Sequence, residues 1–314
     1  MNIINVNHDT GNLPPTVATI GFFDGVHRGH QYLISHVTEE ARRSGMTSMV
    51  ITFDRHPRQV LQSDYQPRLL TTLDNKLRRL SLTDCDAVAV LAFSREMAAL
   101  SARDFMRYVL VDKLNVRKLI IGYDNRFGHN RSEGFEDYVR YGREMGIEVM
   151  RNPAFSIEDV HVSSSMIRSL LQEGEVSMAR RCLGYPYMLA GKVVGGYRNG
   201  HKLGFPTANI DLGGSGQLVP APGVYAVRVR PEGVEEPLGG MMNIGVRPTF
   251  DGREQTLEVH ILDFEGDLYG QSMEVAFVSR IRSERKFDNL MQLAEQLKAD
   301  REQAEALLLT DSQP

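Results

Sequence analysis

The chain has 314 residues, 42% of them apolar, and a formal net charge of −4, so two globular domains of about 100–200 residues each are expected. The negative balance argues against a general nucleic-acid binder, and no apolar run approaches the roughly 18 residues of a membrane helix. The two cysteines, Cys85 and Cys182, are far apart, which argues against a disulfide framework or a cysteine zinc site.

The first residues, MNIINVNHDTGN, have neither a basic segment nor an apolar segment, so no signal peptide is expected. Together with two thiols expected to be buried and reduced, this predicts a cytoplasmic protein. The densest basic run, residues 280–286, contains a glutamate and precedes a helical pattern. We expect that run to be a solvated surface.

The first half of the chain alternates between apolar runs and amphipathic segments. Alternating strands and helices form right-handed βαβ units, so a Rossmann-like parallel α/β domain is expected over residues 1–184. Gly45 should stop the first helix, and Ser101 should cap the third. The predicted strands are 17–20, 49–53, 87–93, 118–121 and 147–150, and the predicted helices are 29–43, 73–82, 101–114, 135–145 and one starting near Ser163.

The pattern changes near Gly184 and Tyr185, where short β-like runs separated by glycine and proline begin. Such a pattern is typical of an antiparallel barrel or sandwich, predicted here over residues 185–314. The polar tail after residue 309 is expected to fray. The predicted strands are 190–194, 207–210, 224–229, 241–244, 257–262 and 273–278, and one helix at 289–309 closes the chain.

The segment GFFDGVHRGH, which begins at Gly21, lies where the first predicted strand leads into the first helix. In an open α/β sheet, ligands bind beyond the carboxyl ends of the strands. The glycines allow a tight turn and a close approach to a ligand, and the N-terminus of the helix favours an anion. His27 and His30 can lie on one side of the helix entry and donate ring N–H groups to phosphate oxygens.

A metal site or an ordinary polar surface would account for this segment less well. A metal pair would need a third Cys, His or Asp at ligand spacing, and none stands there. A single histidine is most often an ordinary polar surface residue. Because these histidines stand among glycines at a strand–turn–helix junction, a ligand site is the better interpretation here. The segment lacks the GxGxxG of a dinucleotide site, and the later glycine-rich stretch at 195–202 lacks the Gly-Lys-Ser/Thr ending of a P-loop.

HRGH resembles the HxGH signature of the nucleotidyltransferase superfamily, whose members transfer nucleotidyl groups from a triphosphate. Two further segments are similar to motifs of that superfamily. GYDNRFG, residues 122–128, resembles its second nucleotide-site loop, and VSSSMIR, residues 162–168, resembles its SSTxIR motif. The resemblance implies that Arg168 projects toward phosphates, whereas the serines alone would suggest no more than a helix cap.

In the second half, LGFPTANI spans residues 203–210. Thr207 and Asn209 are two apart on a predicted strand, so their side chains face the same way. A hydroxyl and an amide oxygen suit a hard cation such as Mg²⁺, with nucleotide phosphates completing the coordination shell. A plain turn followed by a strand accounts for these residues equally well on their own.

LEVHILDF, residues 257–264, alternates cleanly, with its apolar residues on one side and Glu258 and His260 on the other. A carboxylate on a barrel wall could have either of two roles. As a general base, Glu258 could take a proton from a hydroxyl, which is worth about 10²–10⁴ in rate. As a structural residue, it would form an ion pair with Arg247 or another neighbour.

Five segments together resemble the flavokinase domain: GFPTANI, PGVY at 222–225, NIGVRPT at 243–249, LEVHILDF, and LYG at 268–270. With an HxGH domain in front of them, residues 19–308 resemble the bacterial bifunctional riboflavin kinase/FAD synthetase family. Two departures stand out. Ser165 replaces the usual threonine but keeps the hydroxyl, and Asn125 stands where an aromatic residue is common, so a stacking contact is either absent or supplied by Phe127.

The resemblance implies an N-terminal nucleotidyltransferase domain and a C-terminal antiparallel β-barrel flavokinase domain with a closing helix. It implies that MgATP phosphorylates riboflavin to FMN in the second domain, and that the first domain adenylylates FMN to FAD and releases pyrophosphate. The flavin ring would lie against the barrel and the last helix. The expected partners are ATP, riboflavin, FMN and FAD, with no nucleic acid, no membrane and no obligate protein partner.

These arguments give a set of expected site residues. The catalytic residues are Glu258, His27, His30 and Arg168, and the Mg²⁺ ligands are Thr207 and Asn209. In the first domain, the residues that bind ATP or phosphate are Gly21, Phe22, Phe23, Asp24, Gly25, Gly29, Asp124, Asn125, Arg126, Phe127, Ser163, Ser164 and Ser165. In the second domain they are Gly195, Gly200, Lys202, Gly204, Pro206, Thr207, Asn209 and Asn243.

Two rival functions stay open. A flavin or nucleotide sensor could keep the fold and lose catalysis, although intact HRGH, PTAN and Glu258 argue against it. A nucleotidyltransferase for another acceptor could use the barrel as a regulatory or RNA-binding module, although the acidic balance weakens that alternative. Incubation with riboflavin and MgATP, followed by chromatography of the flavins, would distinguish both from the bifunctional enzyme.

Overall fold

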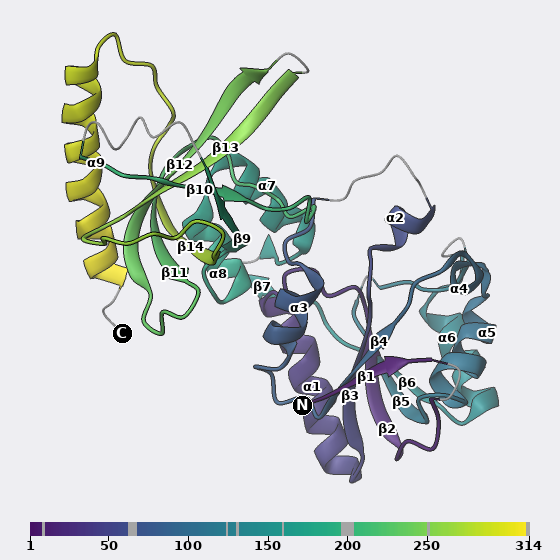
Figure 1. Ribbon diagram of the computed structural model, residues 1–314. Coiled ribbons are helices and arrows are strands. Elements are labelled where there is room, and N and C mark those ends of the chain that lie inside the picture. Colours follow the sequence, from purple (N-terminus) through teal and green to yellow (C-terminus); the bar gives the residue numbers. More distant parts are fainter. Residues whose placement is uncertain are drawn as a thin grey trace. The chain divides into compact units, whose positions relative to one another are not determined.

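The computed structural model describes residues 1–7, 10–61, 68–123, 125–129, 132–158, 160–195, 204–249 and 252–311. It divides into two compact units, Met1–Ser164 and Ser165–Pro314, each described here by itself (Figure 1). In the described residues, no helix is both long and apolar enough to span a membrane.

The first unit is built on a six-stranded sheet in the order β1-β4-β3-β2-β5-β6. All its neighbouring strands pair in parallel. β2 and β4 are buried at every residue, which explains why neither strand alternates between apolar and charged residues. The strands are β1 (Asn2–Val6), β2 (Thr16–Ile20), β3 (Thr47–Phe53), β4 (Ala87–Leu91), β5 (Val116–Ile121) and β6 (Glu148–Arg151).

Helices cover both faces of this sheet, with α1 and α3 on one face and α4, α5 and α6 on the other (Figure 1). Alternate residues of one strand therefore enter different cores: Ala18 and Ile20 pack in one cluster, and Val17 packs in the other. The predicted parallel α/β architecture is confirmed. The helices are α1 (Arg28–Ser44), α2 (Pro57–Leu61), α3 (Leu73–Leu80), α4 (Arg95–Ala99), α5 (Ala102–Phe105) and α6 (Phe135–Met145), with a π-helix, η1, at Met106–Val111.

Several elements of the first unit differ from the prediction. The helix expected at 101–114 is capped by Ser101 as predicted, but it changes from α5 into the π-helix η1 after one turn. β1 was not predicted, because this half-exposed edge strand carries asparagines and no regular alternation. A small antiparallel pair, β7 (Ser156–Ile157) and β8 (Val160–His161), was also not predicted.

The second unit contains a closed antiparallel barrel in the order β10-β13-β12-β11-β14-β9. The sequence pattern allowed either a barrel or a sandwich, and the closed strand order shows that the second unit is a barrel. Before the barrel come α7 (Ser164–Glu173) and α8 (Val176–Leu183). The strands are β9 (Met188–Val194), β10 (Ala208–Asp211), β11 (Gly223–Pro231), β12 (Leu238–Thr249), β13 (Gly252–Ile261) and β14 (Ser272–Arg282).

The last helix, α9 (Leu290–Asp311), lies along the barrel (Figure 1) and packs on β11, β12 and β14. Ala304 and Leu308 of this helix share a core cluster with Phe205, Ala226 and Met241 of the barrel unit. The predicted closing helix is confirmed. It runs two residues beyond the predicted end, into the polar segment that was expected to fray.

Candidate active sites

The turn between β2 and α1 is held in a strained shape. Phe23 and Val26, neither of them glycine, have φ angles of 54° and 36°, and Gly25 has a φ of 79°. A β-branched residue such as Val26 rarely adopts a positive φ. Strain of this kind persists only where the surroundings fix the backbone, and it is common at ligand sites.

Asp24 supplies much of that fixation. The residue is 3% exposed, and its carboxylate accepts hydrogen bonds from the backbone N–H groups of Leu70 and Thr71 at 3.0 and 3.1 Å. The N–H of Gly25 donates to the Thr71 hydroxyl at 3.1 Å. The structure thus gives Asp24, expected to bind ATP or phosphate, a role in anchoring the turn to the segment before α3.

The two histidines of the turn stack on each other, with ring centroids 3.6 Å apart and planes 19° apart. His27 is the N-cap of α1, and its Nδ1 accepts a hydrogen bond from the backbone N–H of His30 at 3.3 Å. Because Nδ1 acts as the acceptor, the ring proton of neutral His27 lies on Nε2. A Cβ on Gly29 would lie 3.2 Å from the His27 ring and 3.3 Å from the Val162 carbonyl, so glycine permits this packing.

Burial lowers the pKa of His30 well below its usual value, and the nearby His27 and Lys76 lower it further. In the described residues, Nδ1 of His30 is buried and has no hydrogen-bond partner. A buried polar atom without a partner costs about 1–3 kcal/mol, so this atom is a candidate for contact with a ligand. The stacked pair therefore places a neutral imidazole, that of His30, beside a second histidine at a helix N-terminus, which suits a phosphate group.

Two more predicted motifs adjoin the turn within the first unit. The hydroxyl of Ser164, the first residue of α7, donates to the Asp24 carbonyl at 2.9 Å. The side-chain amide of Asn125 donates to the Ile20 carbonyl at the end of β2. The structure thus brings Ser164 of the SSSMIR motif and Asn125 of the GYDNRFG motif to the same end of the sheet as the histidines.

The remaining predicted residues of this site have mixed placements. Phe127 stacks on Tyr138 at 4.2 Å and packs against the core, so the structure gives it a packing role. Arg126 is exposed, and Ser163 is half-buried. Asp124 lies outside the described residues. Ser165 and Arg168 belong to the second unit, so their proximity to the histidines stays a prediction.

In the barrel, three predicted residues lie side by side on adjacent strands. Glu258 of β13 is directly opposite Asn209 of β10 on one side and Asn243 of β12 on the other. Directly opposite residues of antiparallel strands place their side chains on the same face, about 4.5–5.5 Å apart. The barrel therefore aligns a carboxylate between two amides. Thr207 is the residue before β10 begins at Ala208, and it is half-buried.

Two residues near this row were not predicted as site residues. Nδ1 of His260 lies 2.8 Å from the Pro206 carbonyl, and its ring meets Phe205 edge-on, so it fixes the segment before Thr207. Burial lowers the pKa of His260, which keeps it neutral. A Cβ on Gly245 would lie 3.0 Å from Oε1 of Glu284 and 3.5 Å from Nδ2 of Asn243, which places a second carboxylate near the row.

The glycine-rich loop before this row is described only at its ends. Gly195 is exposed, and Gly204 has a φ of 78°, a conformation that favours glycine. Gly200 and Lys202 lie outside the described residues. Pro206 is exposed, and its carbonyl is the one that contacts His260.

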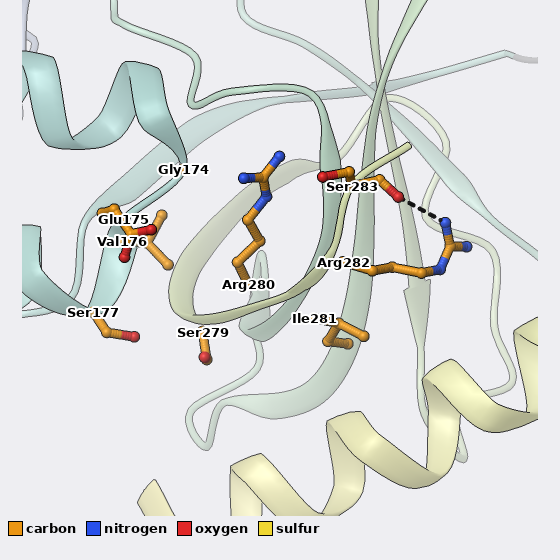
Figure 2. Close-up of a pocket in the computed structure, with 9 residues that line it drawn as sticks. All are labelled: Gly174, Glu175, Val176, Ser177, Ser279, Arg280, Ile281, Arg282 and Ser283. Atoms are coloured by element: carbon orange, nitrogen blue, oxygen red, sulfur yellow. Dashed lines mark hydrogen bonds between the residues drawn. The ribbon is translucent and has the colours of Figure 1, made fainter. Parts of the chain in front are cut away.

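A separate pocket of about 310 Å³ lies between the α7–α8 turn and the end of β14 (Figure 2). Its two guanidinium groups already have partners. Arg280 donates to the carbonyls of Glu173 and Pro222 at 3.1 and 2.8 Å, and Arg282 forms a bidentate pair with Asp300. These arginines therefore join elements of the second unit, and the run at 280–286 is not wholly a solvated surface as expected.

Comparison with known proteins matches the two halves of the chain to two different families. Residues 9–166 match the family model of FAD synthetase, and residues 183–308 match that of riboflavin kinase. The bifunctional riboflavin kinase/FMN adenylyltransferase of Escherichia coli K12 is 39% identical over 302 residues, which is 96% of each chain. That of Bacillus subtilis 168 is 35% identical over 296 residues, which is 92% of this chain and 91% of the relative.

A crystal structure of a protein from Streptococcus pneumoniae matches with a TM-score of 0.88 and 32% identity, over 97% of this chain and 99% of that one. That protein is named a macrolide-efflux protein, an activity that differs from those of the sequence relatives. The likeness shows that both units of the fold are shared. The assignment depends on the two family models and on sequence relatives matched over nearly their full length: the chain belongs to the family of bifunctional riboflavin kinase/FMN adenylyltransferases.

Proposed function

We propose that the two activities of this enzyme are divided between its two units, and that ATP is the donor in both. The barrel unit transfers the γ-phosphoryl group of ATP to the ribityl 5′-hydroxyl of riboflavin and gives FMN and ADP. The parallel-sheet unit transfers AMP from a second ATP to the FMN phosphate and gives FAD and pyrophosphate.

The stacked histidine pair at the start of α1 gives the main support for the adenylyl-transfer site. In this reaction an oxygen of the FMN phosphate attacks the α-phosphorus of ATP, and the bond to pyrophosphate breaks. The attacking group is already an anion, so no general base is needed. The site must align two polyanions and stabilise the charge, which preorganised N–H donors and a helix N-terminus do well.

Each histidine has a separate part in this proposal. The Nε2–H of His27 donates to a phosphate oxygen, because its Nδ1 is occupied by the backbone N–H of His30. His30, whose lowered pKa keeps it neutral, offers its partnerless Nδ1 edge to the nucleotide. Arg168 approaches the phosphates when the SSSMIR helix is in place, as the family resemblance implies.

The row of Asn209, Glu258 and Asn243 supports the kinase site. A neutral hydroxyl is a weaker nucleophile than a phosphate, so Glu258 accepts its proton as the bond to phosphorus forms. Asn243 fixes the carboxylate or the incoming hydroxyl from the neighbouring strand. His260 holds the segment that carries Thr207, and neutral histidine suits that role because its Nδ1–H can donate to the Pro206 carbonyl.

Mg²⁺ would be held by Thr207 and Asn209 together with ATP phosphates. A hydroxyl and an amide oxygen beside a carboxylate form a hard oxygen donor set, which fits this ion. When bound, the ion would neutralise charge on the transferring phosphoryl group. Among the described residues, no group of three or more His, Cys, Asp or Glu side chains could hold a metal.

Paired variants of the full chain test this division. His30→Ala removes a donor aimed at the nucleotide and should reduce FAD formation from FMN by about 10²–10³, with riboflavin phosphorylation within twofold of wild type. Glu258→Gln removes the base and should reduce FMN formation by about 10²–10⁴, with adenylylation retained. Chromatography of the flavins after incubation with MgATP measures both steps.

Retained adenylylation in His30→Ala would remove the histidine from the mechanism, and unchanged kinase turnover in Glu258→Gln would remove the glutamate. Absence of any flavin conversion by wild type would instead support a flavin or nucleotide sensor. Adenylylation without phosphorylation by wild type would support a nucleotidyltransferase with an accessory barrel.

A further inference from the structure

Lys76, on α3, is a lysine buried in the interior of the first unit. Only 2% of it is exposed, and lysine is almost never fully buried unless its ammonium group is paired. None of the motifs of the sequence includes it. Its position therefore calls for a physical account.

The Lys76 ammonium group is saturated by three acceptors. Nζ donates to the carbonyl of Phe22 at 3.1 Å, to the hydroxyl of Thr52 at 3.1 Å and to the carbonyl of Phe53 at 2.9 Å. It also lies 4.1 Å from the centre of the Phe22 ring. The Thr52 hydroxyl in turn donates to the Phe22 carbonyl at 3.1 Å. One side chain thus joins the end of β3 to the turn that follows β2.

The charged and titratable groups around Lys76 come from three elements. Asp24 faces it from the turn, Asp54 from the end of β3, and His30 from α1. Both carboxylates are already engaged: Asp24 accepts from the backbone of Leu70 and Thr71, and Asp54 pairs with Arg55 at 3.1 Å. The two carboxylates therefore compensate the positive charge of Lys76 only in part. This charge also acts on the nearby histidine pair, where it helps to lower the pKa of His30.

We propose that Lys76 is a positioning residue for adenylyl transfer: it fixes the turn that carries the histidine pair, and its buried positive charge strengthens the attraction of that turn for nucleotide phosphates. The inference rests on the proposed adenylyl-transfer site. Lys76 has no contact with the reacting atoms in this account, because all three of its donors are used within the protein.

The first test replaces the charge and keeps the volume. In the full chain supplied with FMN and MgATP, Lys76→Met should raise the KM for ATP by roughly tenfold, since one buried charge near a polyanion contributes about that much. Phosphorylation of riboflavin by the same variant should stay within twofold of wild type. Lys76→Arg keeps the charge and should recover most of the affinity for ATP.

Lys118→Met is the matched control. Lys118 is another largely buried lysine of the same unit, and it pairs with Glu148 and with Glu40, which lies in the C-terminal half of α1, away from the turn. Its loss should leave the KM for ATP within twofold of wild type. An equal rise in KM in both variants would mean that any buried charge lost from the unit has this effect, and it would overturn the proposal.

The second test uses pH and separates positioning from a merely structural role. Burial lowers the pKa of Lys76 from 10.5 to about 8, although Asp24 and Asp54 raise it. Between pH 8 and pH 10.5, approximately, the unfolded chain binds more protons at Lys76 than the folded chain does. Over this range, the contribution of Lys76 to the stability of the folded state therefore increases as the pH rises. Adenylylation should move the opposite way: the KM for ATP of wild type rises as pH passes about 8, and that of Lys76→Met stays flat.

If Lys76→Met fails to fold, the wild-type pH profile still decides. A KM for ATP that is constant from pH 7 to 9 would overturn the proposal. The proposed site and this inference fail separately: retained adenylylation in His30→Ala would remove the site itself. Loss of adenylylation in His30→Ala, together with an unchanged KM for ATP in Lys76→Met, would remove only the role of Lys76.

Discussion

At the scale of single residues, two titratable groups, His30 of α1 and Lys76 of α3, are buried beside the turn between β2 and α1. Burial is the main cause of the lowered pKa of both His30 and Lys76, and the nearby Asp24 carboxylate is satisfied by backbone N–H groups. Donors and positive charge therefore remain for an incoming anion. This arrangement is consistent with the proposed polyphosphate ligand and less so with a cation.

Asp24→Asn tests the anchoring of the turn. Asparagine replaces one oxygen acceptor by an N–H donor that faces the N–H groups of Leu70 and Thr71. The first unit should lose about 1.5–3 kcal/mol of stability, measured by urea unfolding followed by circular dichroism, and FAD formation should fall while riboflavin phosphorylation persists.

Asp84→Asn is the control for that change, because the Asp84 side chain is 79% exposed and its pair with Arg42 lies on the surface. Its effect on stability should lie within about 0.5 kcal/mol. If Asp24→Asn were equally neutral, the turn would be held by other contacts and the anchoring role of Asp24 would be wrong.

Sequence reasoning brought the two histidines together but missed residues that hold their surroundings in place. His27 and His30 stand in one short motif, so spacing alone brought them together. Lys76 was missed because its acceptors, Phe22, Thr52 and Phe53, come from two other segments that only the parallel pairing of β2 and β3 brings near. The alternation of β13 placed His260 on the face of Glu258, but its bond to Pro206 depends on a turn that no periodicity describes.

At the scale of elements, long periodic segments were predicted well and junctions were not. The change from α5 to a π-helix is invisible to a pattern that counts apolar residues. The family models end at residue 166 and begin again at residue 183, so α7 and α8 fall almost entirely between them. The predicted boundary at 184 separates these helices from the barrel, whereas the compact units divide after Ser164.

The contacts of α8 argue that it supports the barrel unit. Its buried side chains include Val176, Ala179 and Leu183, and it packs on β14. A fragment of residues 165–314 should therefore unfold at a higher urea concentration than one of residues 185–314, because each large apolar side chain uncovered costs about 1.5–3 kcal/mol. Both fragments should phosphorylate riboflavin. Equal unfolding midpoints would mean that α7 and α8 add nothing to the barrel unit.

At the scale of the whole molecule, our proposal gives the chain two different ways to hold a triphosphate. In the parallel-sheet unit the proposed site is a helix N-terminus with two stacked imidazoles, and in the barrel unit it is a row of carboxylate and amide groups on three adjacent strands. The difference follows from the nucleophile, since a phosphate needs no base and a hydroxyl does. FMN is the product of the barrel unit and the acceptor in the parallel-sheet unit. Loss of the kinase site should therefore leave riboflavin, and loss of the adenylyl-transfer site should leave FMN.

Complementation between two inactive chains measures this division most directly. His30→Ala supplied with riboflavin and MgATP should stop at FMN, and Glu258→Gln should leave riboflavin unchanged. An equimolar mixture of the two full-length variants should form FAD, because each supplies the site that the other lacks and FMN diffuses between them. FAD formed by either variant alone, or a mixture that still stops at FMN, would contradict the assignment of one reaction to each unit.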